Sequence, residues 1–93
     1  MKVIYTRSMC SACEEAKTFT PDAEIRDVGP GSGHLGTMAR LEMMSALAMN
    51  DISLDNEIGL PVMVEDDRPY KWDGPVDGWT LMLPDRKEMP EPL

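Results

Sequence analysis

Two cysteines, Cys10 and Cys13, lie between a short apolar run and a helix-like stretch. Val3-Ile4-Tyr5 before them has the composition of a buried strand, and Glu14-Glu15-Ala16-Lys17 after them favours a helix. A cysteine at the start of a helix lies beside unpaired backbone N–H groups and the positive end of the helix dipole, and both favour the thiolate. The second cysteine lies about one helical turn away, close enough to form a disulfide with the first. We therefore interpret the pair as a redox dithiol.

The chain has 93 residues, which is enough for one domain with a modest core. Its formal net charge is −8, and most of the acidic excess lies in residues 51–93. Nucleic acids and anionic membrane surfaces repel such a protein, so we expect neither as a partner. Two interpretations of the acidic surface stay open, namely solubility and a partner with a basic docking face. We expect a monomer.

The N-terminal residues include no apolar stretch long enough for a signal peptide or a membrane span, and we therefore expect a cytoplasmic protein. In that reducing compartment, a close-spaced cysteine pair is more often catalytic or metal-binding than a structural crosslink. A disulfide that closes so short a loop would also restrict the unfolded chain very little. Both arguments favour a chemical role for the pair.

Hydrophobic spacing and turn residues predict the order strand, helix, strand, helix, strand, strand, helix. The predicted strands are 2–6, 23–28, 60–64 and 69–72, and the predicted helices are 11–19, 37–50 and 76–83. The first two strands flank a helical crossover and should be parallel, whereas the last two form a hairpin. In the 37–50 helix, the apolar spacing predicts a packed face made of Met38, Leu41, Met44, Ser45 and Ala48.

Other residues receive less specific interpretations. Most of the nine methionines are interpreted as core filler on the helix that contains Met38 and Met49. The alternative is an exposed methionine cluster that contacts a hydrophobic partner. His34, the only histidine, lies in a glycine-rich stretch and is interpreted as a solvated side chain.

Over residues 1–83 this order resembles the thioredoxin fold in its minimal, glutaredoxin-like form, with Cys10-Ser11-Ala12-Cys13 after the first strand and Leu60-Pro61 opening the third. The resemblance implies an α/β domain of order βαβαββα, with a mixed four-stranded sheet flanked by helices. Residues 84–93 would then be a proline-rich tail. It also implies a cis peptide bond before Pro61, which would face the cysteines and leave the backbone of Leu60 free to pair with a substrate.

Two further segments contribute to the resemblance. Arg7 occupies the place where glutaredoxins commonly have a basic residue that favours the thiolate and meets a glutathione carboxylate. The segment from Trp72 to Asp77 is similar to the Trp-x-Gly segment and following Asp of redoxins that serve ribonucleotide reductase, and in glutaredoxins the Asp meets the amine of glutathione. The chain differs from the usual glutaredoxin pattern because Ser11-Ala12 replaces the usual Pro-Tyr and the double glycine is absent.

The resemblance implies a thiol–disulfide oxidoreductase with Cys10 as the nucleophile and Cys13 as the resolving thiol. Its partners would be a disulfide-containing protein and an electron donor, either glutathione or a thioredoxin reductase, and no cofactor would be bound. One alternative is a binding module of the same fold without redox activity. Another is an iron–sulfur or zinc module that uses the same cysteines. That module would need a dimer or an added thiol, because a zinc site takes four ligands and this chain offers two sulfurs and the distant His34.

Overall fold

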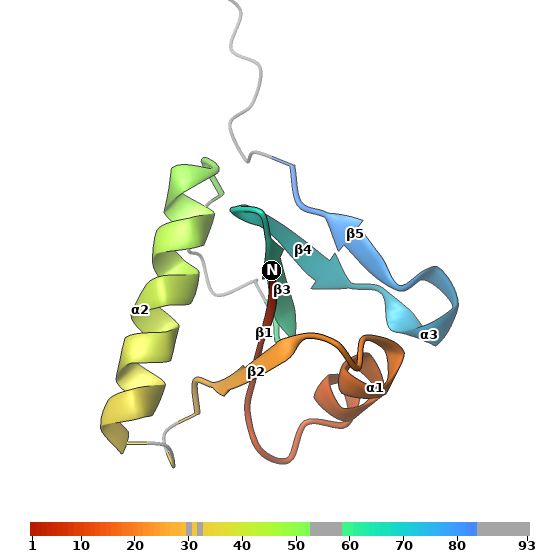
Figure 1. Ribbon diagram of the computed structural model, residues 1–93, viewed down its shortest axis with the longest axis horizontal. Helices are drawn as coiled ribbons and strands as arrows, with labels where there is room; N and C mark the ends of the chain where they lie inside the picture. Colours follow the sequence, from red (N-terminus) through yellow and green to blue (C-terminus); the bar gives the residue numbers. More distant parts are fainter. Residues whose placement is uncertain (30, 32, 53–58, 84–93) are drawn as a thin grey trace, which may run out of the picture.

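The computed structural model describes residues 1–29, 31, 33–52 and 59–83 of the chain, which form five strands and three helices. In chain order the elements are β1 (Lys2–Thr6), α1 (Ser11–Phe19), β2 (Glu24–Asp27), α2 (Gly33–Met49), β3 (Val62–Glu65), β4 (Arg68–Trp72), α3 (Gly74–Asp77) and β5 (Trp79–Leu81). Helix α2 lies on one side of the sheet, and α1 and α3 lie together on the other (Figure 1). The predicted α/β class is confirmed.

The sheet is mixed and has the strand order β2-β1-β3-β4-β5. Strands β1 and β2 are parallel, and the other neighbouring pairs are antiparallel. The parallel pair and the β3–β4 hairpin were both predicted from the sequence. Asp66 and Asp67 form the hairpin turn with φ angles of 53° and 65°, a conformation that Asp tolerates better than most residues.

The prediction of a final helix over residues 76–83 is wrong. Helix α3 has only four residues, and it ends at Gly78, whose φ of 67° and ψ of −136° lie outside the helical region. The chain then forms β5, in which Trp79 pairs with Trp72 of β4. Aromatic and β-branched residues suit such a cross-strand pair, and the sheet therefore has five strands rather than four.

Helix α2 differs from the prediction in its start and in its packed face. It begins at Gly33 rather than at Thr37. The side that faces the sheet contains the buried residues Gly36, Ala39 and Leu47 and the half-buried Met43. The predicted face is wrong, since Met38 is 49% exposed and Leu41 is 57% exposed. Helix α2 is apolar on two sides, and the small side chains of Gly36 and Ala39 allow the closer approach to the sheet.

The two faces of the sheet are covered differently. Against α2, the core contains Val3, Tyr5, Val28 and Ala39, with Met43, Leu60 and Val64 packed beside them. On the other face, Phe19 of α1 packs edge-on against Trp72, and Trp72 packs edge-on against Trp79, with ring centroids 5.2 and 5.0 Å apart. The indole Nε1 of Trp79 donates a hydrogen bond of 2.7 Å to Thr20 Oγ1. These contacts attach the end of α1 to the last two strands.

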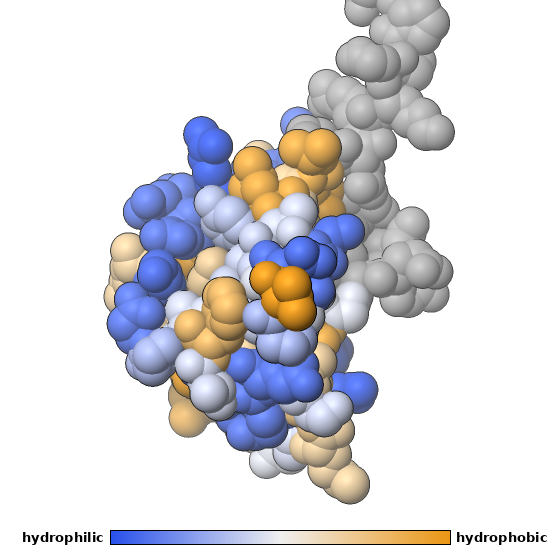
Figure 2. All heavy atoms as spheres, turned by 90° about the vertical axis from the view of Figure 1, so that its right-hand side faces the viewer, coloured by the Kyte–Doolittle hydropathy of each residue, from blue (hydrophilic) through white to orange (hydrophobic). Residues whose placement is uncertain are grey.

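The predicted tail at residues 84–93 and most of the predicted loop at residues 51–59 lie outside the described residues. In the part of the chain that is described, no helix combines the length and the apolar character needed to cross a lipid bilayer. On the face that carries α3 and β5, hydrophobic side chains lie in separate spots among hydrophilic ones (Figure 2).

Candidate functional site

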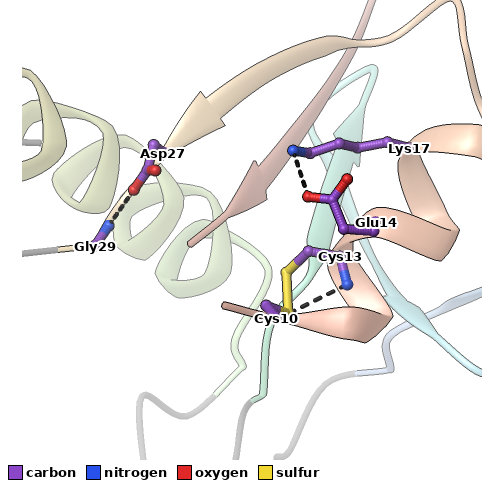
Figure 3. Close-up of a disulfide and its surroundings, with 6 residues drawn as sticks. All are labelled: Cys10, Cys13, Glu14, Lys17, Asp27 and Gly29. Atoms are coloured by element: carbon purple, nitrogen blue, oxygen red, sulfur yellow. Dashed lines mark hydrogen bonds and ion pairs between the residues drawn. A yellow bond between two sulfur atoms is a disulfide. The ribbon is translucent and has the colours of Figure 1, made fainter. Parts of the chain in front are cut away.

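Cys10 and Cys13 form a disulfide at the start of α1 (Figure 3), with their Cα atoms 5.2 Å apart. Cys10 is the N-cap residue of α1 and has an extended backbone, with φ −127° and ψ 102°. Its Sγ accepts a hydrogen bond of 3.2 Å from the backbone N–H of Cys13. An N-cap side chain normally satisfies one of the unpaired amides of the first helical turn, and here a sulfur takes that place. The predicted position of Cys10 at the helix N-terminus is thereby confirmed.

The two cysteines differ in their exposure. Cys13 is completely buried, at 0% exposure, within the first turn of α1. Cys10 is only partly buried and lies at the end of the loop that leaves β1. Cys10 is therefore the more accessible of the two cysteines, whereas Cys13 is shielded from the solvent and bonded to Cys10.

The charges beside the cysteines include one ion pair. Glu14 and Glu15, in the first turns of α1, oppose a thiolate by like charge. The carboxylate of Glu14 pairs with Lys17 Nζ at 3.0 Å, and both side chains are substantially exposed (Figure 3). The pair offsets the negative charge of Glu14 next to the disulfide, although its own contribution to stability is small at such exposure. The sequence contains the signal for this contact, an acidic and a basic residue three positions apart on a helix.

The remaining candidate residues lie at the same end of the strands as the cysteines. Val62 pairs with Tyr5 near the end of β1, and Lys71 pairs with Val62. Pro61 precedes β3 and Trp72 ends β4. Both residues therefore lie at the end of the sheet where the chain leaves β1 for Cys10. The peptide bond between Leu60 and Pro61 is cis, in agreement with the expectation from the resemblance.

Arg7 and Asp77 lie at this end of the sheet, and neither forms a hydrogen bond or an ion pair with the described cysteines. Arg7 is exposed and lies next to Gly29, because a Cβ built on Gly29 would be 3.3 Å from Arg7 Cβ. Asp77 is exposed at the end of α3. Among the described residues, neither side chain makes a hydrogen bond or ion pair with Cys10 or Cys13. Among the candidate residues that the structure describes, the two cysteines are bonded to each other, and the other candidates lie at the same end of the sheet.

Met9, which directly precedes Cys10, was not among the residues predicted to belong to the site. Its side chain is fully exposed, at 100%, and its backbone has a φ of 57°. A polarizable thioether at this place would contact any molecule that approaches Cys10. Nothing in the sequence distinguishes Met9 from the other methionines, because its exposure results from the turn between β1 and α1.

Trp72 has a different unexpected feature. Its indole Nε1 is buried, and it has no hydrogen-bond partner in the described structure. A buried donor without an acceptor is uncommon. The indole ring is nevertheless held on both sides by Phe19 and Trp79.

In the described residues, no group of three or more His, Cys, Asp or Glu side chains is arranged to hold a metal ion. Comparisons with models of protein families, with curated proteins and with solved structures find no match to this chain.

Proposed function

We propose that this protein is a thiol–disulfide oxidoreductase with a thioredoxin-like fold of the glutaredoxin type. The observation that carries the proposal is the asymmetry of the cysteine pair. Cys10 is accessible at the helix N-cap, and it is bonded to Cys13, which is fully buried. The parallel β1–α1–β2 unit followed by the β3–β4 hairpin supports the proposed fold.

The proposed reaction begins with the reduced dithiol. The thiolate of Cys10 attacks one sulfur of a target disulfide, which forms a mixed disulfide and releases the other target sulfur as a thiolate. The Cys13 sulfur then attacks Cys10 Sγ and releases the second target sulfur, which takes up the Cys13 proton and leaves as a thiol. The target gains two electrons and the protein loses two, so the protein ends as the Cys10–Cys13 disulfide.

Local groups favour the first step. The N–H of Cys13 points at Cys10 Sγ, and the positive end of the α1 dipole lies at the same place, so a negative charge on this sulfur is stabilised. Lys17 offsets the opposing charge of Glu14. Burial of Cys13 restricts the approach of competing molecules to this sulfur, which leaves it to react with Cys10.

The oxidised protein must be reduced again by an electron donor. Two donors are consistent with the proposal, glutathione and a flavin-dependent thioredoxin reductase, and we favour the reductase. Ser11-Ala12 between the cysteines lacks the tyrosine of the glutaredoxin pattern, and the chain lacks the double glycine, so the basis for a glutathione site is weak. The proposed substrate is a disulfide in another protein, and the proposed setting is the cytoplasm, where such donors operate.

Titration of thiols in the purified protein tests the proposal. We expect two reactive thiols after reduction, none after oxidation, and recovery of both after a second reduction, with no effect of a chelator. An absorption spectrum of anaerobically purified protein is recorded in parallel. Thiols that appear only after chelation, or cluster absorbance that is lost together with iron, would instead support the metal-binding alternative. A disulfide that cannot be reduced without unfolding would contradict both functions.

A further inference from the structure

Helix α2 carries a row of large apolar side chains on the side that the sheet does not cover. Leu35 is 76% exposed, Met38 49%, Leu41 57% and Met49 75%. The first three follow one another at intervals of three residues and therefore lie along one side of the helix. We call these four residues the outer face of α2. Adjoining apolar side chains exposed in this way are typical of a surface that binds another molecule.

A groove adjoins the outer face, between α2 and β2. Its volume is about 580 Å³, which is within the range of binding pockets. Its apolar lining is supplied by Ile25, Leu35, Met38 and Ala39. Strand β2 is at the edge of the sheet, so the groove is bordered by a strand that has a neighbour on one side only. The groove is lined by residues of α2, and α2 lies on the opposite side of the sheet from α1, which begins at the cysteine pair (Figure 1).

The charged groups of the groove are predominantly acidic. Arg26 pairs with Glu24 at 2.9 Å and also with Glu42, which accepts a hydrogen bond from the hydroxyl of Tyr5. Asp27 adds a further carboxylate to the lining. Of the charged residues that line the groove, Asp27 and Glu42 are acidic and Arg26 is basic, and Glu24 neutralises Arg26 further from outside the lining, so the groove has a net negative charge.

This charge indicates which kind of molecule the surface fits. Two copies of the chain, each with a formal net charge of −8, would repel each other across acidic grooves. An anionic membrane would be repelled for the same reason. A segment that presents apolar side chains flanked by lysine or arginine satisfies both the apolar outer face and the acidic groove.

We propose that the outer face of α2 and the adjoining groove bind a basic amphipathic helix of a partner protein. Apolar residues of the partner would cover Leu35, Met38 and Leu41, and one of them would enter the groove beside Ile25. Its basic residues would face Asp27 and Glu42. Such helix-in-groove recognition uses apolar anchors at helical spacing. The proposal does not depend on the redox chemistry of the opposite face.

The test uses two synthetic helical peptides, one made of leucine and lysine and the other with glutamate in place of each lysine. Binding to the full chain is measured by fluorescence anisotropy at low and high salt, and the site is mapped by amide shifts in NMR spectra. We expect the lysine peptide to bind at least tenfold more tightly than the glutamate peptide, with shifts confined to α2 and β2. Added salt should reduce the difference.

The double variant Leu35→Gln/Met38→Gln should raise the dissociation constant of the lysine peptide about tenfold or more, because apolar anchors are lost. Val76→Gln is the matched control, since Val76 is 91% exposed on α3, which lies on the opposite side of the sheet from α2 (Figure 1). It should leave binding unchanged. Equal binding of the two peptides, shifts outside α2 and β2, equal effects of the two variants, or a dimer that buries the outer face in sedimentation experiments would overturn the proposal.

Discussion

The contact between Gly78 and Phe19 leads to a prediction about stability. Gly78 ends α3 with a φ of 67°, and a Cβ at this position would lie 2.9 Å from Phe19 Cζ and 3.0 Å from Cε2. Gly78→Ala should therefore be destabilising for two separate reasons. The backbone conformation costs a non-glycine residue about 1–3 kcal/mol. The ring of Phe19 must also move, which weakens its edge-on contact with Trp72 by a further ~0.5–1.5 kcal/mol.

Two other glycines separate these contributions. Gly74 has a φ of 100°, but a Cβ there would meet nothing within 4 Å, so Gly74→Ala should show only the backbone cost. No described atom lies within 4 Å of a Cβ built on Gly31, and Gly31→Ala should leave the free energy of unfolding nearly unchanged or raise it slightly. We expect Gly31→Ala to be the most stable of the three variants, Gly74→Ala to be less stable, and Gly78→Ala to be the least stable.

Urea unfolding followed by tryptophan fluorescence measures these differences. For a domain of this size, about 1 kcal/mol corresponds to roughly 4–8 °C in the melting temperature, so thermal unfolding gives an independent check. Near-ultraviolet circular dichroism should change in Gly78→Ala but not in Gly74→Ala, because only the former displaces the ring of Phe19. If Gly78→Ala were as stable as Gly31→Ala, the described geometry of this turn would be refuted.

Three further predictions concern other parts of the molecule. Burial, and secondly the carboxylate of Glu42, raise the pKa of the Tyr5 phenol above its ordinary value of 10.0. The stability linked to the neutral phenol is present below pH 10 and is lost as the pH rises through the raised pKa. Absorbance titration of wild type against Tyr5→Phe will detect the raised pKa. Trp79→Phe removes the hydrogen bond to Thr20 and should lower the free energy of unfolding by about 1 kcal/mol beyond the loss of ring contacts; the same substitution in a Thr20→Val background should cost less, and equal costs would exclude the hydrogen bond as the cause. In coupled NADPH assays, thioredoxin reductase should reduce the oxidised protein faster than glutathione with glutathione reductase, and turnover by glutathione alone would contradict the preferred donor.

The part of the fold that surrounds the cysteines could be predicted from the sequence. The bounds of β1 and α1 agree with the prediction, because a short apolar run and a helical stretch with a stop at Thr20-Pro21 are strong local signals. The hairpin of β3 and β4 was recognisable from its acidic turn. Local sequence also placed Cys10 at a helix N-terminus, and in this position its Sγ accepts a hydrogen bond from the backbone N–H of Cys13.

Features that depend on tertiary packing were not predictable in the same way. Strand β5 was mistaken for a helix because Trp79 pairs with Trp72, a contact that local spacing does not reveal. The packed side of α2 was misassigned because apolar residues occur on both sides of it, and the sheet selects the side with Gly36 and Ala39. The complete burial of Cys13 follows from the position of α1 on the sheet, and this burial gives the two cysteines their different proposed roles.

In the proposed reaction Cys10 attacks and Cys13 resolves the mixed disulfide, and adduct formation with 2-hydroxyethyl disulfide distinguishes these two roles. Reduced wild type, Cys13→Ser and Cys10→Ser are each treated with this probe, and intact mass with peptide mapping identifies any attached thiol. We expect Cys13→Ser to retain a stable mixed disulfide on Cys10, because no second thiol can release it. Wild type should pass to the Cys10–Cys13 disulfide without a retained adduct, and Cys10→Ser should react far more slowly because Cys13 is buried. In Cys10→Ser the remaining thiol is Cys13, and in Cys13→Ser it is Cys10. If the first variant formed its adduct as fast as the second, the proposed roles of the two cysteines would be contradicted.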